Sequence, residues 1–367
     1  MSSSKFTDFY QLFPTPDNST RVVLANIYSL TLSLAFKSVN IEFYISIFGV
    51  ILTIFHLIVL TRKPMRTSSI MSLMITTAIC DLVSMIVAMS VKDIILSFVP
   101  SECTPPVSLF TYQLFNLLQS IRDDVVRCST WLSVLMALIR LVTLKWSIKG
   151  YQSISISTFL FGFQVSGVAF FISSFFSCFF WLKRKLEQVG EWNPGASCPD
   201  QTSRGLPVYE IHVSDYFTSH SDLLLRIYMF LNGTTSKILP CLLFPLLAIL
   251  LVLELRRNAA NSRKSSTVSN KNNNTERTTG LVVFMSLTFF IALLPSGIVT
   301  SLQAIYTDKG FLYMSTYIDH ICYAMLNVNA SLHCLTCFAM SSQYRKTVRG
   351  VLRIPKGSVV VRMMMRS

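Results

Sequence analysis

One stretch of the sequence limits the possible folds more than any other. From Cys128 to Leu144, seventeen residues carry a single charge, that of Arg140, and Lys145 and Lys149 follow the run. A helix needs about 20 mostly apolar residues to cross the hydrocarbon core of a bilayer. The stretch therefore predicts a membrane-spanning helix. An ionisable residue at membrane depth is costly and marks a candidate functional site, so Arg140 is the first candidate.

The composition of the whole chain also points to a membrane. Of its 367 residues, 51% are hydrophobic and 14% are charged, whereas a soluble domain has about 25% charged residues. Residues 1–20 show no basic segment followed by an apolar run. We therefore expect no cleaved signal peptide and insertion through the first spanning helix.

Six further apolar runs accompany the first. Together they predict an all-α membrane protein, a bundle of seven transmembrane helices at about 41–60, 70–91, 108–144, 154–181, 227–253, 278–305 and 313–340. Residues 22–36 are apolar but too few to span a bilayer. We expect them to form a helix that lies against the membrane or the bundle and ends at Lys37. The polar residues 254–277 predict a mobile loop. Residues 343–353 predict a short cytosolic amphipathic helix.

Lysine and arginine gather on one side of these predicted helices. That side holds nineteen of the 32 basic residues of the chain and two acids. Because basic loops stay in the cytosol, we expect a plasma-membrane protein with an extracellular segment (1–40), a seven-transmembrane domain (41–342) and a cytosolic tail (343–367). Topology and attraction to the lipid bilayer explain the net charge of +14, so we exclude nucleic acid as a partner.

Charged residues mark the predicted outer mouth of the bundle. Asp123 and Arg127 are four residues apart and share one helix face, where they can form an ion pair. Either the two residues pair only with each other, or they belong to a charged patch that meets a ligand from outside. Asp124, Lys237 and Asp319 are further candidates for the same patch.

Asp81 is the one acid well inside the second predicted span. A buried carboxylate needs polar partners, and Ser133, Asn329 or His333 could supply them. Such a cluster either fixes helix packing only or forms a relay or ion site that differs between conformations.

Two cysteines fall in predicted extracellular loops, Cys103 and Cys198, where oxidising conditions permit a disulfide. The alternatives are two free thiols or Cys178 as a competing partner. Asn18 opens a glycosylation sequon.

The pattern from His333 to Cys337 superficially resembles a metal site but lacks a fourth ligand, so it predicts helix packing. With no phosphate-binding loop, no HExxH and only scattered histidines, we expect no metal, no cofactor and no enzyme.

Several stretches together resemble the rhodopsin-like G-protein-coupled receptors. More narrowly, they resemble the nematode serpentine receptors of class W, which are similar to FMRFamide-type neuropeptide receptors. The similarity covers about residues 40–350. The stretches are TRKPMRTSS at 61–69, AICDL at 78–82, RDD at 122–124, STWLSVLMALIR at 129–140, SKILP at 236–240, RTT at 277–279 and MSSQYRK at 340–346.

The resemblance implies roles for individual residues. Arg140 matches the arginine that inserts toward the G protein, and Cys103 and Cys198 match the family disulfide. Asp81 matches the second-helix aspartate and Pro295 the proline of the sixth-helix switch, and we expect Asn329 and His333 to belong to the same conformational switch. We expect a basic rim to meet the G protein together with Arg140; it comprises Arg66, Lys145, Arg256 and Arg277.

The sequence also departs from the wider rhodopsin-like pattern. Ile139 replaces the acid before the arginine, Leu293 replaces the switch tryptophan, and Thr53 stands where the helix-one asparagine is expected. The NPxxY motif reads HCLTC at 333–337. The seventh span has no lysine for a retinal Schiff base, which excludes an opsin.

The resemblance implies a receptor that binds an extracellular ligand, a peptide by our expectation, and activates a heterotrimeric G protein. One alternative is a chemosensory receptor for a small, non-peptide environmental ligand, and another is a seven-helix protein that does not couple. A transporter or channel would need charges throughout the bundle, and the fourth and sixth spans carry none.

Overall fold

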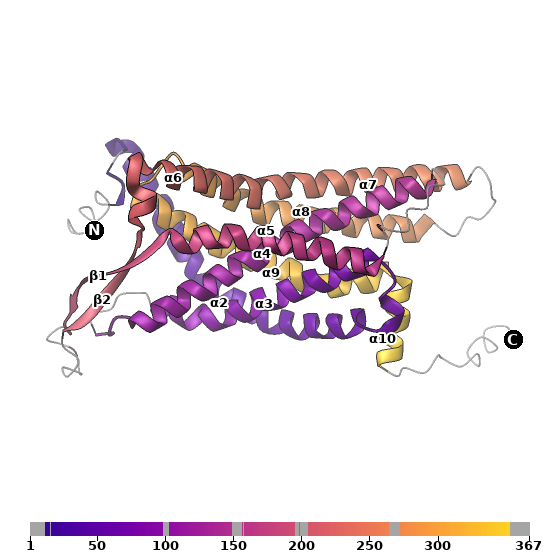
Figure 1. Cartoon of the computed structure of the whole chain (residues 1–367), viewed down its shortest axis with the longest axis horizontal. Coiled ribbons are helices and arrows are strands. Elements are labelled where there is room, and N and C mark those ends of the chain that lie inside the picture. The colour runs from indigo at the N-terminus through magenta and orange to yellow at the C-terminus, as the bar shows by residue number, and fades with distance from the viewer. Residues whose placement is uncertain are drawn as a thin grey trace.

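The helices of the chain lie side by side along the long axis of the molecule in the computed structural model (Figure 1). The structure describes residues 12–14, 16–97, 103–148, 156, 158–194, 198, 205–263 and 272–352. The end of the tail (353–367) and Lys149 lie outside the described residues.

The helices are α2 (Asn18–Leu60), α3 (Ser69–Ser97), α4 (Leu109–Ile148), α5 (Phe159–Leu182), α6 (Asp215–Gly233), α7 (Leu239–Arg263), α8 (Asn272–Leu302), α9 (Lys309–Met340) and α10 (Ser342–Val351). A short 3-10 turn, η1 (Lys63–Met65), follows α2, and a π-helical turn, η2 (Thr234–Ile238), joins α6 to α7. The strands are β1 (Arg184–Trp192) and β2 (Leu206–Val213).

The predicted seven-helix bundle is confirmed. Within the described residues, six helical stretches are long and apolar enough to cross a membrane, with α6, η2 and α7 forming one of them. α8 supplies the seventh, and its described apolar part covers Leu287–Leu302. Helices suit this environment because every backbone N–H and C=O inside a bilayer must be bonded within the protein.

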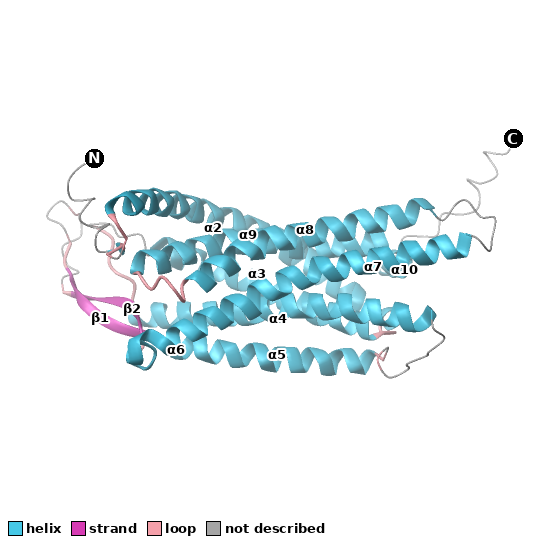
Figure 2. Cartoon of the chain, turned by 90° about the horizontal axis from the view of Figure 1, so that it is seen from above, coloured by secondary structure: helices cyan, strands magenta, loops and turns pink. Residues whose placement is uncertain are grey.

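The two ends of the bundle differ in character, as Figures 1 and 2 show. We call the end that carries β1 and β2 the hairpin end. The opposite end carries η1 and α10, and we call it the basic end. The amphipathic helix α10 is confirmed there: Tyr344 and Val348 are buried against Val59, Leu60 and Met65.

The prediction that residues 22–36 form a separate short helix is wrong. α2 is continuous over 43 residues, which corresponds to about 64 Å of helix, roughly twice the hydrocarbon thickness. Lys37 is exposed and does not interrupt the buried face, which continues through Ala35, Val39 and Glu42 at helical spacing. One charged residue on the outer face is compatible with an amphipathic helix. α2 therefore continues through residue 40, where we placed the boundary between the extracellular segment and the seven-transmembrane domain. The boundaries of the three segments remain predictions.

The predicted loop at 254–277 is also largely helical. α7 continues to Arg263 and α8 begins at Asn272, while 264–271 lie outside the described residues. Helical hydrogen bonds are local and do not need an apolar solvent, so polarity alone did not mark where these helices end.

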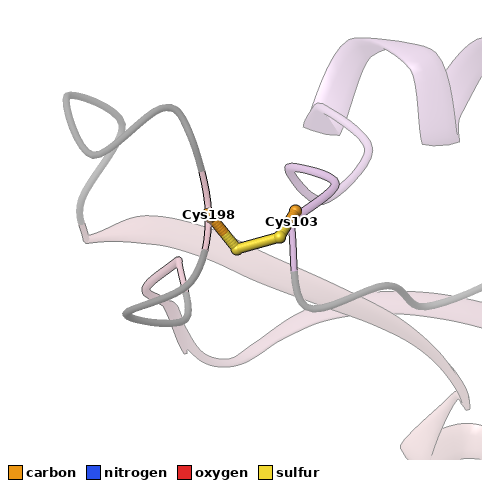
Figure 3. The surroundings of a disulfide bond; sticks show 2 residues. All are labelled: Cys103 and Cys198. Atoms are coloured by element: carbon orange, nitrogen blue, oxygen red, sulfur yellow. A yellow bond between two sulfur atoms is a disulfide. The ribbon is translucent and has the colours of Figure 1, made fainter.

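The predicted disulfide is confirmed, because Cys103 and Cys198 are bonded with their Cα atoms 5.3 Å apart (Figure 3). Cys178, the competing partner, is free and exposed. The bridge lies beside the antiparallel hairpin of β1 and β2. It ties the segment before α4 to the loop between the two strands.

The start of α2 is held against the bundle at the hairpin end. The Arg21 guanidinium donates to the carbonyl oxygens of Phe13 (2.8 Å) and Pro16 (2.7 Å). Phe13 is buried against Phe311 and Met314 of α9. The segment before α2 therefore packs across the end of α9.

Candidate functional site

A small cavity of about 20 Å³ lies between the helices toward the hairpin end. Its lining mixes charged, polar and apolar side chains: Asp123, Val126, Arg127, Thr130, Ser236, Lys237, Leu293, Ser296, Cys322, Tyr323 and Leu326. The volume has room for roughly one water molecule. The cavity thus brings together three of the five residues predicted to meet a ligand.

The predicted pair of Asp123 and Arg127 on α4 is confirmed as an ion pair. Arg127 is 4% exposed, and its guanidinium also donates to Ser236 Oγ (2.9 Å) and to the backbone oxygen of Ser173 (2.8 Å). Tyr323 approaches the other oxygen of Asp123 at 3.4 Å. The arginine thus links α4 to α5 and η2.

A second ion pair joins η2 to α9. Lys237 Nζ lies 2.9 Å from Asp319 Oδ1 and 3.0 Å from Thr300 Oγ1. Ser296 donates to the same Asp319 oxygen. Lys237 is buried in the π-helical turn, and such turns are frequent at functional sites. Both residues were predicted separately as ligand-binding candidates, and the fold brings them together as a pair.

Asp124 faces a different direction from the other candidates. Its Oδ2 accepts a hydrogen bond from Ser174 on α5 at 2.8 Å. The structure therefore places Asp124 at the contact between α4 and α5, and it does not line the small cavity.

A third ion pair, between Arg122 and Glu42, escaped the sequence analysis. Both side chains are buried, and Asn327 Nδ2 donates to the same Glu42 oxygen at 3.0 Å. The Arg122 guanidinium carbon lies 4.4 Å from the centre of the Tyr323 ring. One feature of the sequence could have indicated a buried partner for Arg122: Glu42 is the one acid between residues 22 and 60.

Asp81 lies deeper in the bundle and contacts α9. Its Oδ2 is 3.1 Å from His333 Nδ1, and its Oδ1 accepts a hydrogen bond from Ser129 at 2.7 Å. Of the predicted partners, His333 is confirmed. Ser133 was wrong because its hydroxyl donates to the backbone oxygen of Ser129. Asn329 was also wrong, because its side-chain oxygen accepts from Thr288 on α8.

A larger cavity of about 190 Å³ lies toward the basic end. Four methionines and two histidines share its lining with Arg140: His56, Met65, Met71, Met74, Thr77, Ser133, Met136, Ala137, Arg140, Phe244, Ala248, Leu251, His333, Thr336, Cys337, Ser341 and Tyr344. Arg140 Nη2 lies 3.9 Å from Met74 Sδ, and no acid among the described residues pairs with it.

Tyr344 closes one side of this larger cavity and was also missed. The residue is fully buried, and its hydroxyl lies 2.8 Å from His56 Nδ1 and 3.4 Å from Cys334 Sγ. Cys334, part of the pattern from His333 to Cys337, therefore packs in a contact between α2, α9 and α10, as the sequence predicted for that pattern.

The remaining predicted residues lie at the basic end, at the start of α2 or inside α8. Arg66, Lys145 and Arg256 are exposed at the basic end, whereas the side chain of Arg277 lies outside the description. Pro295 lies inside α8. Asn18, the predicted glycosylation acceptor, is exposed at the start of α2 and accepts a hydrogen bond from Arg21.

Comparison with known proteins fits this geometry. The model of the family described as serpentine type 7TM GPCR chemoreceptor Srw matches residues 40–355. The chain belongs to the Srw family. A curated relative from Caenorhabditis elegans, the G-protein coupled receptor dmsr-1, is 28% identical to this Srw receptor over 235 residues. The match covers 61% of the chain but 44% of the relative, so less than half of that receptor is represented.

Proposed function

We propose that this Srw receptor binds a peptide at the hairpin end and activates a heterotrimeric G protein at the basic end. The observation that carries the proposal is the pair of cavities. One is lined by Asp123, Arg127 and Lys237, which belong to two ion pairs, and the other by methionines and Arg140. Membership of the Srw family supports the receptor class, and the two cavities support the two proposed sites.

The small cavity supports a ligand that changes the packing of the bundle. At about 20 Å³ it is too small for an amino-acid side chain, so a ligand that reaches Asp123 or Lys237 must separate helices. Charged or polar ligand groups could replace Arg127 or Asp319 as partners. A ligand shifts a conformational equilibrium only through such differential contacts.

The larger cavity supports docking of a helix from the G protein. Methionine side chains adapt to different apolar surfaces, and an amphipathic helix places its apolar face in such a groove. Arg140 is half-buried there and has no acidic partner among the described residues. It is therefore available to backbone carbonyls at the end of an incoming helix.

Peptide is the favoured ligand class because of the resemblance to FMRFamide-type receptors and the charged lining of the small cavity. A second candidate, a small environmental ligand, is favoured by the chemoreceptor description of the family. Both candidates place the ligand outside the cell and the basic end in the cytosol, since the basic residues of the short loops gather at that end.

The test is nucleotide exchange on a panel of Gα subunits in membranes that contain the full chain, with a pooled peptide library. We expect stimulated exchange by the wild type and none by Arg140→Ala, at equal surface expression. Arg349→Ala, an exposed change on α10, serves as the control. Full signalling by Arg140→Ala would refute the role of Arg140. Stimulation by pooled odorants but no peptide would favour the second candidate.

A further inference from the structure

Two adjacent basic residues at the hairpin end, Lys183 and Arg184, have no acid partner among the described residues. Neighbouring basic side chains do have one: Arg122 pairs with Glu42, Arg127 with Asp123, Lys237 with Asp319, and Lys185 with Glu187 and Asp215. Lys183 and Arg184 directly follow α5, and both are partly buried. They are therefore two positive charges within the folded end of the bundle that no described acid pairs directly.

Both side chains contact helices of the bundle. Lys183 Nζ lies 3.9 Å from Met229 Sδ on α6 and 5.3 Å from the centre of the Tyr228 ring. Arg184 Nη1 donates to Asn116 Oδ1 on α4 at 2.8 Å, which leaves the other guanidinium N–H groups available. The next residue, Lys185, is 45% exposed and forms its ion pairs at the surface.

Burial dominates the electrostatics of the two cations, and the acids that act on them do so without forming an ion pair. Burial and the charge of Arg184 lower the pKa of Lys183 to about 7, and burial lowers the pKa of Arg184 to about 10. Besides Arg184, the groups whose charge acts on Lys183 are Asp123, Lys237 and Asp319. The Tyr228 hydroxyl is buried and has no hydrogen-bond partner among the described residues. A buried hydroxyl without a partner is costly.

We propose that Lys183, Arg184 and Tyr228 form a subsite for a carboxylate of the peptide ligand. The inference rests on the proposed function and adds the chemistry of one ligand group. A guanidinium holds a carboxylate with two parallel hydrogen bonds, and an ammonium adds a point charge. A tyrosine hydroxyl can donate to the same group. An aspartate or glutamate side chain has the required chemistry.

The helix geometry gives the distance from this subsite to the small cavity. Asn116 precedes Asp123 by seven residues on α4, and Met229 precedes Lys237 by eight. At 1.5 Å per residue these separations correspond to about 10–12 Å along the bundle. An extended peptide advances about 3.3 Å per residue. We therefore place the acid about three residues from the ligand residue that reaches the small cavity.

The test compares two matched libraries of fluorescent peptides in membranes that contain the full chain. One library carries Asp or Glu at a scanned position, and the other carries Asn or Gln there. We expect the acidic library to bind about 10-fold or more tightly. Lys183→Gln with Arg184→Gln should abolish that difference, whereas Lys185→Gln should preserve it. Lys183→Arg keeps the positive charge and should therefore retain the preference for the acidic library. This result would show that the loss of charge, and not the change of side chain, abolishes the preference.

Equal binding of the two libraries would overturn the subsite, and so would an equal loss in Lys185→Gln. Binding of neither library would refute the proposed peptide receptor, and a second measurement then decides the subsite alone. An amine-reactive ester labels Lys183, and mass spectrometry gives the rate. N-acetylaspartate amide should slow this labelling more than N-acetylasparagine amide at the same concentration. Equal rates would overturn the subsite.

Discussion

Replacing Glu42 by Gln tests the buried ion pair that the sequence analysis missed. The Arg122 and Glu42 side chains are 1% and 4% exposed. The substitution removes the negative charge but leaves Arg122 positive and buried among helices. Breaking a buried pair from one side costs about 3–5 kcal/mol, since the remaining charge lies outside water without a partner. We expect the free energy of unfolding to fall by about that amount.

The assay is the free energy of unfolding of the purified receptor, titrated with dodecyl sulfate in mixed micelles. Glu187→Gln is the matched control because the Glu187–Lys185 pair is 43% and 45% exposed. An exposed pair contributes about 1 kcal/mol or less. The double variant Glu42→Gln with Arg122→Gln should recover part of the loss because no buried charge remains. Equal losses in Glu42→Gln and Glu187→Gln would refute the reasoning.

Three further predictions concern the hairpin end. Gly310→Val should displace Phe13, since an added Cβ would lie 2.5 Å from its ring; faster tryptic cleavage after Arg21 would confirm this, and an unchanged rate would contradict it. Cys198→Ser should lower the thermal midpoint, with a loss of about 2–4 kcal/mol, and a reductant should then have no further effect on that variant. Affinity for acidic peptides should fall as the pH rises through about 7, because Lys183 loses its proton there and a bound carboxylate raises its pKa; amide analogues should show no such slope.

The parts of the fold that were predictable follow from local rules. A bilayer forces the backbone into helices, so runs of apolar residues identified the seven spans. The Asp123–Arg127 pair followed from spacing on one helix face. The Cys103–Cys198 bridge was one of several open alternatives and depended on both cysteines lying on the same side of the membrane.

The long-range pairs could not be derived in the same way. Arg122 and Glu42 are 80 residues apart, and Lys237 and Asp319 are 82 apart. Their contact depends on how each helix is rotated about its axis, which spacing within one helix does not reveal. The length of α2 was missed for another reason. The length of an apolar run indicates only the part of a helix that crosses the hydrocarbon core. Buried small residues continue the packing face of α2 beyond that part.

One helix, α4, carries polar groups of both cavities and of the cluster between them. Asp123 lines the small cavity, Ser129 binds Asp81, and Arg140 lines the large cavity. Seventeen residues separate Asp123 from Arg140, which is about 25 Å of helix. A rotation of this helix would move all three groups together. We therefore expect a ligand that gives Arg127 or Asp123 a new partner to act on Arg140 through α4. This coupling requires that α4 has two packing arrangements and that contacts at each of the two cavities shift the equilibrium between them.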